Sequence, residues 1–582
     1  MAAGTWTNAT ENGDWSNAGN WSGVAAPGNG ETATFDGSEA ARGLPDGTDN
    51  EPSAGAINIV IAEAITANLE GNLFHGKGAT IGAVTVNHAS ANITAGADIT
   101  GNITMATGTL NIAAARALSG SVDLMGGTFA LDASGVVASA DSFNMSAGST
   151  LTIAAGTTLD LAALMSVNST ADSIVNAGII QGTVNMTAAV WTGTGAIAVD
   201  QDGTLNLGTD TANSQSVTVT AAAVTLGDSF TCKSFVLNKD GGVLTVTGGK
   251  TITADTVTLT DGALDSAGSL NVAMTGTGGL SWNSTYNKGL GTVTFSAGCT
   301  TTAGDTVVCA KVAGAGTVVG NSKKIDLRPT ADAFWTLTTA ADGCLIINIY
   351  ATAARSNATL INAGTSPVLI GSAQTYTLTG GLTCAGLTMN GTGATLDLDG
   401  GNLTCTDLKF DTANDTLTLG SGTHTITTIA RVLDETGCAL NIDGTTTISS
   451  TVNLAGITCT IAATATTTLA GAVTASAAGT FTLGGNVTFT ASLTLANMTV
   501  DFGAGIITGT VGTETINAAS ATSLADSGAQ IRNCTVSNFA DYGTRRLRVR
   551  HVIEGASMTK RLLHLDYPRH RAGRFRRDSG RL

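Results

Sequence analysis

The feature that most constrains the fold is a repeat in the second half of the chain with a period of about 21 residues, in the range typical of repeat architectures. Leu-Thr-Cys stands at 382–384 and again at 403–405, and the same position recurs in later segments. The last residues of these triplets are Cys384, Cys405, Ile426, Ile448, Leu469 and Phe489. A regular recurrence of this kind indicates one structural unit repeated along the chain.

Two further registers keep the same period. One holds Leu387, Leu408, Ile429, Val452, Val473 and Leu493; the other holds Leu396, Leu417, Leu440, Cys459 and Phe481. The second of these is followed two residues later by Leu398, Leu419, Ile442, Ile461 and Leu483. Apolar residues that alternate with polar ones indicate a strand with one buried face. Each repeat therefore predicts three short strands separated by Gly, Asn, Asp and Ser turns.

A chain that returns to the same register at a fixed interval must coil. Stacked coils pair each strand with its equivalent one turn later, at roughly 4.8 Å. We therefore expect an all-β fold, a parallel β-helix or solenoid with three short strands per coil. Parallel crossovers are overwhelmingly right-handed, so we expect that hand. "TGTLNI" near Leu110, "GGTFAL" near Phe129 and "GSTLTI" near Leu151 predict that the coils extend into the first half.

The pattern predicts three regions. Residues 1–54 form a Trp-containing N-terminal cap or attachment region, and residues 55–540 form the parallel β-helix. Within it, 310–370 is the least regular stretch, where we expect a bulge or an inserted loop. Residues 541–582 form a basic C-terminal tail. No apolar run approaches the roughly 18–20 residues needed to cross a membrane, so membrane insertion is not expected.

Half of the six tryptophans, namely Trp6, Trp15 and Trp21, lie close together at the start of the chain. A solenoid needs a cap, because its first coil otherwise exposes apolar side chains and open strand edges. Large aromatic side chains can close that end. The alternative is a group of exposed rings on which a sugar stacks. We favour the cap, since terminal repeats are normally atypical.

The opening also carries a recognisable pattern: Trp15-Ser16-Asn17, Asn20-Trp21-Ser22, Pro27-Gly28, then Thr32 to Phe35-Asp36. It resembles the opening of bacteriophage structural proteins of the tail-fibre or head-decoration kind. It is also similar to autotransporter-like bacterial surface proteins with β-strand repeats. The resemblance covers positions 1–37 and brings no catalytic residues with it.

From this resemblance we expect a non-catalytic structural protein of a virion: a β-helical rod attached to a phage particle as a fibre, spike or capsid decoration. It would assemble in the host cytoplasm, contact other virion proteins and itself, most plausibly as a trimer, and meet a host surface glycan. The chain begins Met-Ala-Ala-Gly-Thr-Trp, without the basic start and apolar core of a secretion signal. The alternative is a bacterial cell-surface adhesin or extracellular filament subunit. A polysaccharide-degrading β-helix enzyme ranks third.

Carboxylates gather at Asp397, Asp399, Asp407, Asp411 and Asp415. Paired carboxylates could act as acid and base or hold Ca²⁺. Basic partners are scarce, however, so we interpret the cluster as solvated turn residues and expect no enzyme, no cofactor and no metal. His88 and His424 lie in Thr-rich stretches and are expected to point outward rather than bind a ligand.

The nine cysteines contain no Cys-x-x-Cys motif, so a metal or redox site of that kind is not indicated. Cys384 and Cys405 occupy equivalent positions on neighbouring coils, and the sequence leaves open whether they, or Cys438 and Cys459, are oxidised. We favour a buried column of small apolar side chains, because the strand separation is slightly long for an unstrained disulfide.

The C-terminal tail reverses the charge of the chain. Residues 545–582 hold 12 of the 27 Lys and Arg and 3 of the 43 Asp and Glu, a net charge of +9. The preceding residues carry 15 basic and 40 acidic side chains. We expect an interaction tail for an acidic surface; a docking segment for a neighbouring subunit and a recently acquired segment remain alternatives. Nucleic acid is the weakest candidate partner. The candidate contact residues are Arg545, Arg546, Arg548, Arg550, Arg574, Arg576 and Arg577.

Overall fold

The computed structural model describes residues 3–537 with short gaps, of which 37–55 and 70–79 are the longest, together with Val552–Ile553. It divides into two compact units, Met1–Ile346 and Ile347–Leu582. Each unit consists of parallel strands stacked as a β-solenoid, which confirms the predicted fold class. In the described part the one helical segment is a short 3-10 turn, Ala18–Asn20. None of its helices is long and apolar enough to span a membrane.

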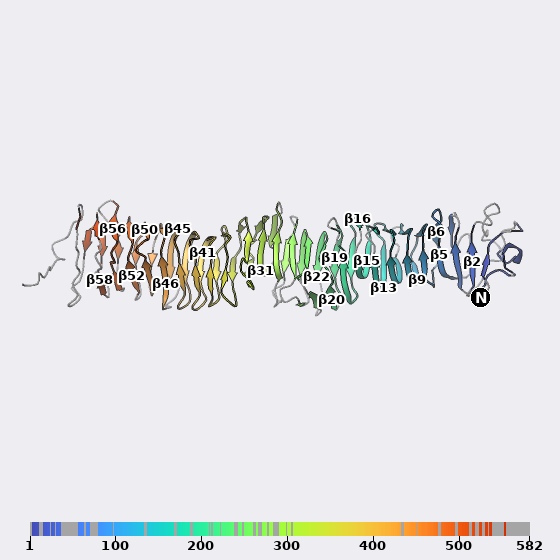
Figure 1. The fold of residues 1–582 in the computed structure, drawn as a ribbon, viewed down its shortest axis with the longest axis horizontal. Helices are drawn as coiled ribbons and strands as arrows, with labels where there is room; N and C mark the ends of the chain where they lie inside the picture. Colours follow the sequence, from blue (N-terminus) through green and yellow to red (C-terminus); the bar gives the residue numbers. More distant parts are fainter. Residues whose placement is uncertain are drawn as a thin grey trace, which may run out of the picture. The chain divides into compact units, whose positions relative to one another are not determined.

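The first unit begins with a ladder of strands that pair in parallel, one coil after another (Figure 1). Its first strands are β1 (Ala3–Thr5), β2 (Thr32–Phe35), β3 (Ala56–Ile61), β5 (Thr80–Val86), β7 (Ile103–Met105), β9 (Arg116–Leu124), β11 (Val137–Met145), β13 (Thr158–Val167) and β15 (Ile179–Met186). The second face of the same coils carries a seven-stranded sheet. Its strands are β4 (Thr66–Asn68), β6 (Asn92–Ala95), β8 (Thr109–Ile112), β10 (Thr128–Leu131), β12 (Thr150–Ile153), β14 (Ser173–Asn176) and β16 (Val190–Thr192).

The number of strands per coil changes along the first unit. Between β9 and β15 each coil has one long strand and one short strand, and the long strands shift register internally, as β11 does between Ala140 and Ser142 against β9. The long strand thus joins two of the three strands that the sequence predicts, because the chain bends there without a turn. Later coils separate the three, as in β19 (Ser216–Val219), β20 (Ala223–Leu226) and β21 (Phe230–Thr231).

The irregular stretch 310–370 contains the division between the two units. On the first unit's side it contains β31 (Val307–Gly314), which belongs to a 24-stranded sheet that begins at β21 and pairs with two neighbouring strands. Val307–Cys309 pairs with β33 (Lys324–Leu327), and Val312–Gly314 pairs with β34 (Trp335–Leu337). A single strand here holds the two registers that separate strands hold in other coils.

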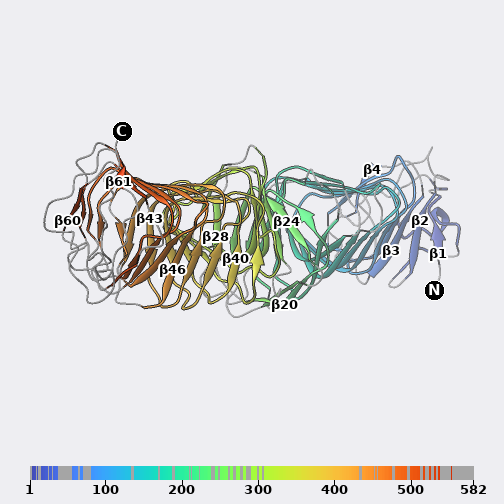
Figure 2. The same ribbon diagram turned by 60° about the vertical axis from the view of Figure 1, so that its left-hand side comes forward.

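The second unit repeats a coil of two faces, one with β43 and the other with β46 (Figure 2). Each of its early coils consists of one long strand and one short strand. These are β41 (Leu382–Met389) and β42 (Thr395–Asp397), β43 (Leu403–Phe410) and β44 (Thr416–Thr418), and β45 (Thr423–Arg431) and β46 (Cys438–Ile442). The next coils have three strands. These are β47 (Thr445–Ile448), β48 (Val452–Asn453) and β49 (Ile457–Ile461); β50 (Thr466–Leu469), β51 (Val473–Thr474) and β52 (Thr480–Leu483); and β53 (Asn486–Phe489), β54 (Leu493–Thr494) and β55 (Thr499–Asp501).

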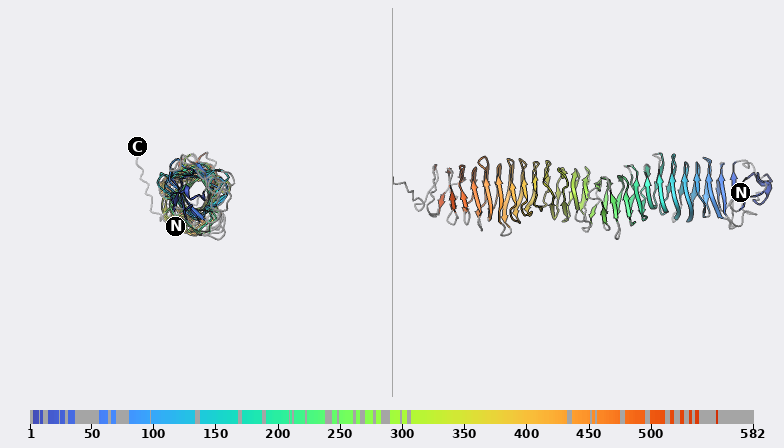
Figure 3. Two further views of the ribbon diagram at one scale, coloured as in Figure 1. Left: turned by 90° about the vertical axis from the view of Figure 1, so that its right-hand side faces the viewer. Right: turned by 60° about the horizontal axis from the view of Figure 1, so that its bottom comes forward.

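The three predicted registers are confirmed as stacked columns within this unit. Cys384 pairs with Cys405, Cys405 with Ile426, and the column continues through Ile448 and Leu469 to Phe489. The column that starts at Leu387 runs in register to Leu493, and the one that starts at Leu396 runs to Phe481. Neighbouring strands lie side by side throughout the stack (Figure 3). Their inward side chains form the core.

In the first unit the three motifs of the sequence pair as predicted. Phe129 of β10 stands opposite Leu110 of β8 on one side and Leu151 of β12 on the other. All three are fully buried. Phe129 also contacts Phe143 of β11 edge to face, with ring centroids 5.3 Å apart. The side chains of the two sheets thus meet in one core between the faces of the coil.

Candidate functional site

The three N-terminal tryptophans form one buried cluster at the first strand of the ladder. Trp6, Trp15 and Trp21 are only 0%, 2% and 4% exposed. Trp21 lies at the centre, with its ring centroid 4.9 Å from that of Trp6 and 4.6 Å from that of Trp15, edge to face in both pairs. Phe35 of β2 completes the cluster, 6.3 Å from Trp21. The rings are therefore core side chains and offer no exposed platform for sugar stacking.

The Asn20-Trp21-Ser22 motif has a structural explanation. The buried Oδ1 of Asn20 accepts hydrogen bonds from the backbone N–H and the hydroxyl of Thr10, which holds the loop between them. Trp6 and Trp21 form an isolated antiparallel bridge, and the Oγ of Ser22 accepts from the N–H of Thr5 in β1. The motif thus attaches an irregular segment to the open edge of the first strand, which is what a cap requires.

The indole N–H groups of Trp15 and Trp21 also have partners in this segment. Trp15 donates its Nε1–H to the carbonyl of Pro27 at 3.2 Å, and Trp21 donates to the carbonyl of Trp15 at 2.7 Å. A buried indole N–H without an acceptor is costly, so these bonds fix the order in which the rings stack. The resemblance of the opening pattern rests partly on Trp15, Trp21 and Pro27, and these three residues therefore belong to one packed arrangement.

The five carboxylates of the second unit do not converge on one site. Among the described residues, no group of three or more His, Cys, Asp or Glu side chains is placed to hold a metal ion. Asp397 accepts from the N–H of Asp399 in its own turn, and Asp411 accepts from the side chain of Asn390. Asp407 lies half-buried on β43.

Asp415 corrects the interpretation of this group as solvated turn residues, because it is fully buried. Its Oδ1 accepts from the N–H groups of Gly393 and Ala394, both at 2.9 Å, and its Oδ2 accepts from the hydroxyl of Thr412. It therefore holds the turn of the preceding coil. Asp172 does the same in the first unit, where its Oδ1 accepts from Gly148 and Ser149.

His424 was predicted to point outward, and this is wrong. It is fully buried in β45, where its Nδ1 accepts a 3.2 Å hydrogen bond from the N–H of Leu403. Burial lowers the pKa of His424, and the carbonyl of Gly420 opposes this effect. His88 lies half-exposed after β5, where its Nδ1 accepts from the N–H of Ser90.

The stacked cysteines are thiols in a buried column. Cys384 and Cys405 pair in register on β41 and β43, and both are buried and free. Burial raises the pKa of the Cys405 thiol to about 12 and that of Cys384 well above its usual value. Cys438 pairs with Ile457 and Cys459 with Leu440, so these two cysteines occupy different registers.

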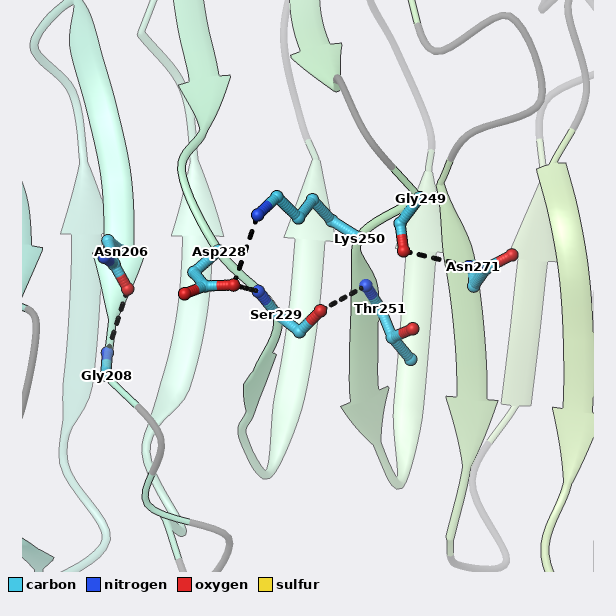
Figure 4. A network of polar contacts seen from close by, with 8 residues as sticks. All are labelled: Asn206, Gly208, Asp228, Ser229, Gly249, Lys250, Thr251 and Asn271. Atoms are coloured by element: carbon cyan, nitrogen blue, oxygen red, sulfur yellow. Dashed lines mark hydrogen bonds and ion pairs between the residues drawn. The ribbon is translucent and has the colours of Figure 1, made fainter.

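Polar side chains in the first unit connect successive coils along the outer face (Figure 4). Asp228 accepts from the N–H of Ser229 and from the ammonium of Lys250 at 3.2 Å, while the Oγ of Ser229 accepts from the N–H of Thr251. These contacts lower the pKa of Asp228. Lys233 forms a similar pair with Asp255 and lowers the pKa of that carboxyl. Exposed pairs of this kind contribute little stability, about 0–1 kcal/mol.

Several sequence predictions lie outside the described residues. They include all seven candidate arginines of the basic tail and the cysteines at 299 and 534. Within the tail the structure describes Val552–Ile553, a short strand that pairs in parallel with Ile531–Arg532. A set of buried polar side chains was not predicted from the sequence, among them Asn176, Gln215 and Thr446. The alternation of inward and outward positions along each strand places them inside, but a polar side chain is normally expected to face the solvent.

Comparisons with family models, with curated proteins and with solved structures found no match to this chain. The resemblance of the opening residues to phage and autotransporter-like proteins therefore stays a prediction.

Proposed function

We propose that this chain is a non-catalytic structural protein of a virus particle, attached to a phage as a fibre, spike or capsid decoration. The observation that carries the proposal is the unbroken register of the stacked columns from Cys384 to Phe489. Such a stack is a stiff scaffold, because each coil is held by the backbone bonds of both neighbours.

The outward faces support a scaffold rather than an enzyme. On β45, β47 and β50 the outward positions are threonines, stacked coil on coil as Thr423, Thr445 and Thr466. The acidic side chains that could have formed a catalytic pair instead accept hydrogen bonds from nearby turns, as Asp397 and Asp415 do. Fold alone does not establish function, so the role is argued from these surfaces.

The threonine face of β45, β47 and β50 suits side-by-side association of identical chains. Its hydroxyls can exchange hydrogen bonds between neighbouring chains, and the stacked threonines bring no charge to oppose contact there. We therefore propose a homo-oligomer, with a trimer favoured, that contacts other virion proteins through one end and a host surface glycan along its length. Sedimentation equilibrium of the purified chain measures the number of copies directly.

Gold-labelled antibodies against the purified chain provide the test of location. They should decorate particles released from lysed cells of the source organism and should leave the surface of intact cells unlabelled. Label on intact cells and none on particles would instead indicate the adhesin or filament subunit. Release of reducing sugar ends from acidic polysaccharides by the purified chain would indicate an enzyme.

A further inference from the structure

One inward column of the second unit changes from apolar to polar and back again. Its members pair in register on successive coils, and all are buried. They are Leu382, Leu403, His424, Thr446, Thr467, Val487 and Ile507. The Nε2 of His424 and the Oγ1 atoms of Thr446 and Thr467 make no hydrogen bond with any described protein atom. Three consecutive coils therefore bring three buried polar atoms without protein partners into one column.

The hydrogen bond to Leu403 fixes which ring nitrogen of His424 carries the proton. The donor in this bond is a backbone N–H, so Nδ1 must be the unprotonated acceptor. A neutral imidazole then has its proton on Nε2. The neighbouring coil places Thr446 at the paired position of the same column. The Gly420 carbonyl also interacts with the ring, but Nε2 forms no hydrogen bond of normal geometry with it.

Leaving three polar atoms unpaired in a core is costly, about 1–3 kcal/mol for each. Direct bonds along the column are too long, since equivalent residues of adjacent coils lie about 4.8 Å apart. A water molecule between two such residues can reach both at hydrogen-bond lengths of about 2.8 Å. We propose that the second unit binds a file of buried waters, which bridge His424 to Thr446 and Thr446 to Thr467.

The donors and acceptors are compatible with such a file. The first water accepts from the Nε2–H of His424 and donates to the hydroxyl of Thr446. That hydroxyl has one proton and two lone pairs, so it can serve the second water as well, which then meets Thr467. Each water gains at least two side-chain partners, the minimum that buried waters usually have. Leu403 and Val487 close the two ends of the file with apolar side chains.

Valine substitutions test the proposal by the sign of their effect. Val487 already occupies the position after Thr467, so Thr467→Val and Thr446→Val fit the column. If waters bridge the hydroxyls, each change removes a partner of a bound water and lowers the melting temperature by a few degrees. The double variant should lose less than the sum of the two, because both changes affect the same water. If the column is dry, each change removes an unpaired hydroxyl and raises the melting temperature, which overturns the proposal.

Matched controls lie one residue away on the same strands. Thr447→Val and Thr468→Val alter the outward hydroxyls of β47 and β50 and should change the melting temperature little. Equal losses from the outward and inward changes would show that valine is unfavourable in these strands whatever the face, and would count against the file.

A crystal structure of the unaltered chain at high resolution gives the direct measurement. Density for water within hydrogen-bond distance of Thr446 Oγ1 and Thr467 Oγ1 is the expected result. Hydroxyls turned to backbone carbonyls, with the His424 Nε2–H bonded to Gly420, would overturn the proposal even if the valine variants were less stable. The corresponding structure of Thr446→Val/Thr467→Val should lack the second water.

Discussion

Asn176 and Gln215 are 39 residues apart, yet the Nδ2 of Asn176 donates a 2.7 Å hydrogen bond to the Oε1 of Gln215 inside the first unit. Both side chains are fully buried. The Nε2 of Gln215 donates to the carbonyl of Gly193 at 2.9 Å, so the pair also binds the coil between its two members. This network satisfies its donors within the protein, in contrast to the polar column of the second unit.

We expect Gln215→Leu to lower the free energy of unfolding by about 1–3 kcal/mol, because it removes the nearer of the two acceptors of the buried Asn176 Nδ2 and leaves the Ala196 carbonyl as the other. Urea unfolding measures the change. Gln201→Leu, at an exposed position of the same unit, is the control and should have little effect. A Gln215→Leu variant as stable as the unaltered protein would show that the amide pair contributes nothing to the packing of these coils.

The register predicts opposite outcomes for neighbouring residues of β44. Leu417 is buried between Leu396 and Leu440, so Leu417→Asp should cost more than the ~2–5 kcal/mol of a Leu→Ala change, because it also buries a charge. Thr418→Asp should cost far less, about 1 kcal/mol or below, since its side chain points outward and the like charge of Asp397 on the paired strand adds only a solvent-exposed repulsion. Circular dichroism during thermal unfolding compares the two. Similar damage from both would contradict the inward and outward faces described above.

Burial of His424 makes stability depend on pH. The folded pKa lies below the usual 6.5, so the folded state favours the neutral ring and the unfolded state takes up a proton first. Stability should therefore be complete above about pH 7 and should fall as the pH drops through about 6.5, by at most ~1.4 kcal/mol per pH unit. Urea midpoints between pH 7.5 and 5.5 measure the slope. His424→Gln, which cannot titrate, should flatten it; an unchanged slope would assign the pH dependence to other groups.

The buried thiols should be unreactive in the native protein. A thiol reacts as the thiolate, and the pKa of Cys405 is raised to about 12. We expect iodoacetamide at pH 8 to leave Cys384 and Cys405 unmodified in the folded chain and to modify both in urea. Peptide mass mapping reads out each site. A native peptide pair linked through Cys384 and Cys405 would contradict the free thiols of this column.

The basic tail provides a prediction that depends on the proposed virion role. Deletion of 545–582 removes a net charge of +9 and the short strand Val552–Ile553 that pairs with Ile531–Arg532. It should leave the preceding coils folded but reduce incorporation of the chain into particles. The contact should weaken as salt rises past roughly 0.15 M, where screening acts beyond about 8 Å. Quantitative mass spectrometry of purified particles measures incorporation. Normal incorporation of the shortened chain would make the Trp6, Trp15 and Trp21 region the better attachment candidate.

Much of the architecture was predictable because each coil of a solenoid repeats the residue pattern of the coil before it. The positions of Cys384, Leu387 and Leu396 set the three columns, and each later coil repeats them at the same interval. Apolar alternation then decides which side chains enter the core. The same parity places His424 on the face of Ile426, but a polar residue between threonines suggested the solvent side.

The repeat pattern did not predict the hydrogen bonds between side chains of one coil and groups of another. Asp415 is buried because two N–H groups of the preceding coil's turn, at Gly393 and Ala394, point at its carboxylate. Asn176 is buried because Gln215 reaches it from two coils away. The repeat period and strand parity determine which face a residue occupies, because both are properties of the backbone. Only the stacked coils decide whether a polar side chain on the inner face finds a partner, because that partner lies in another coil.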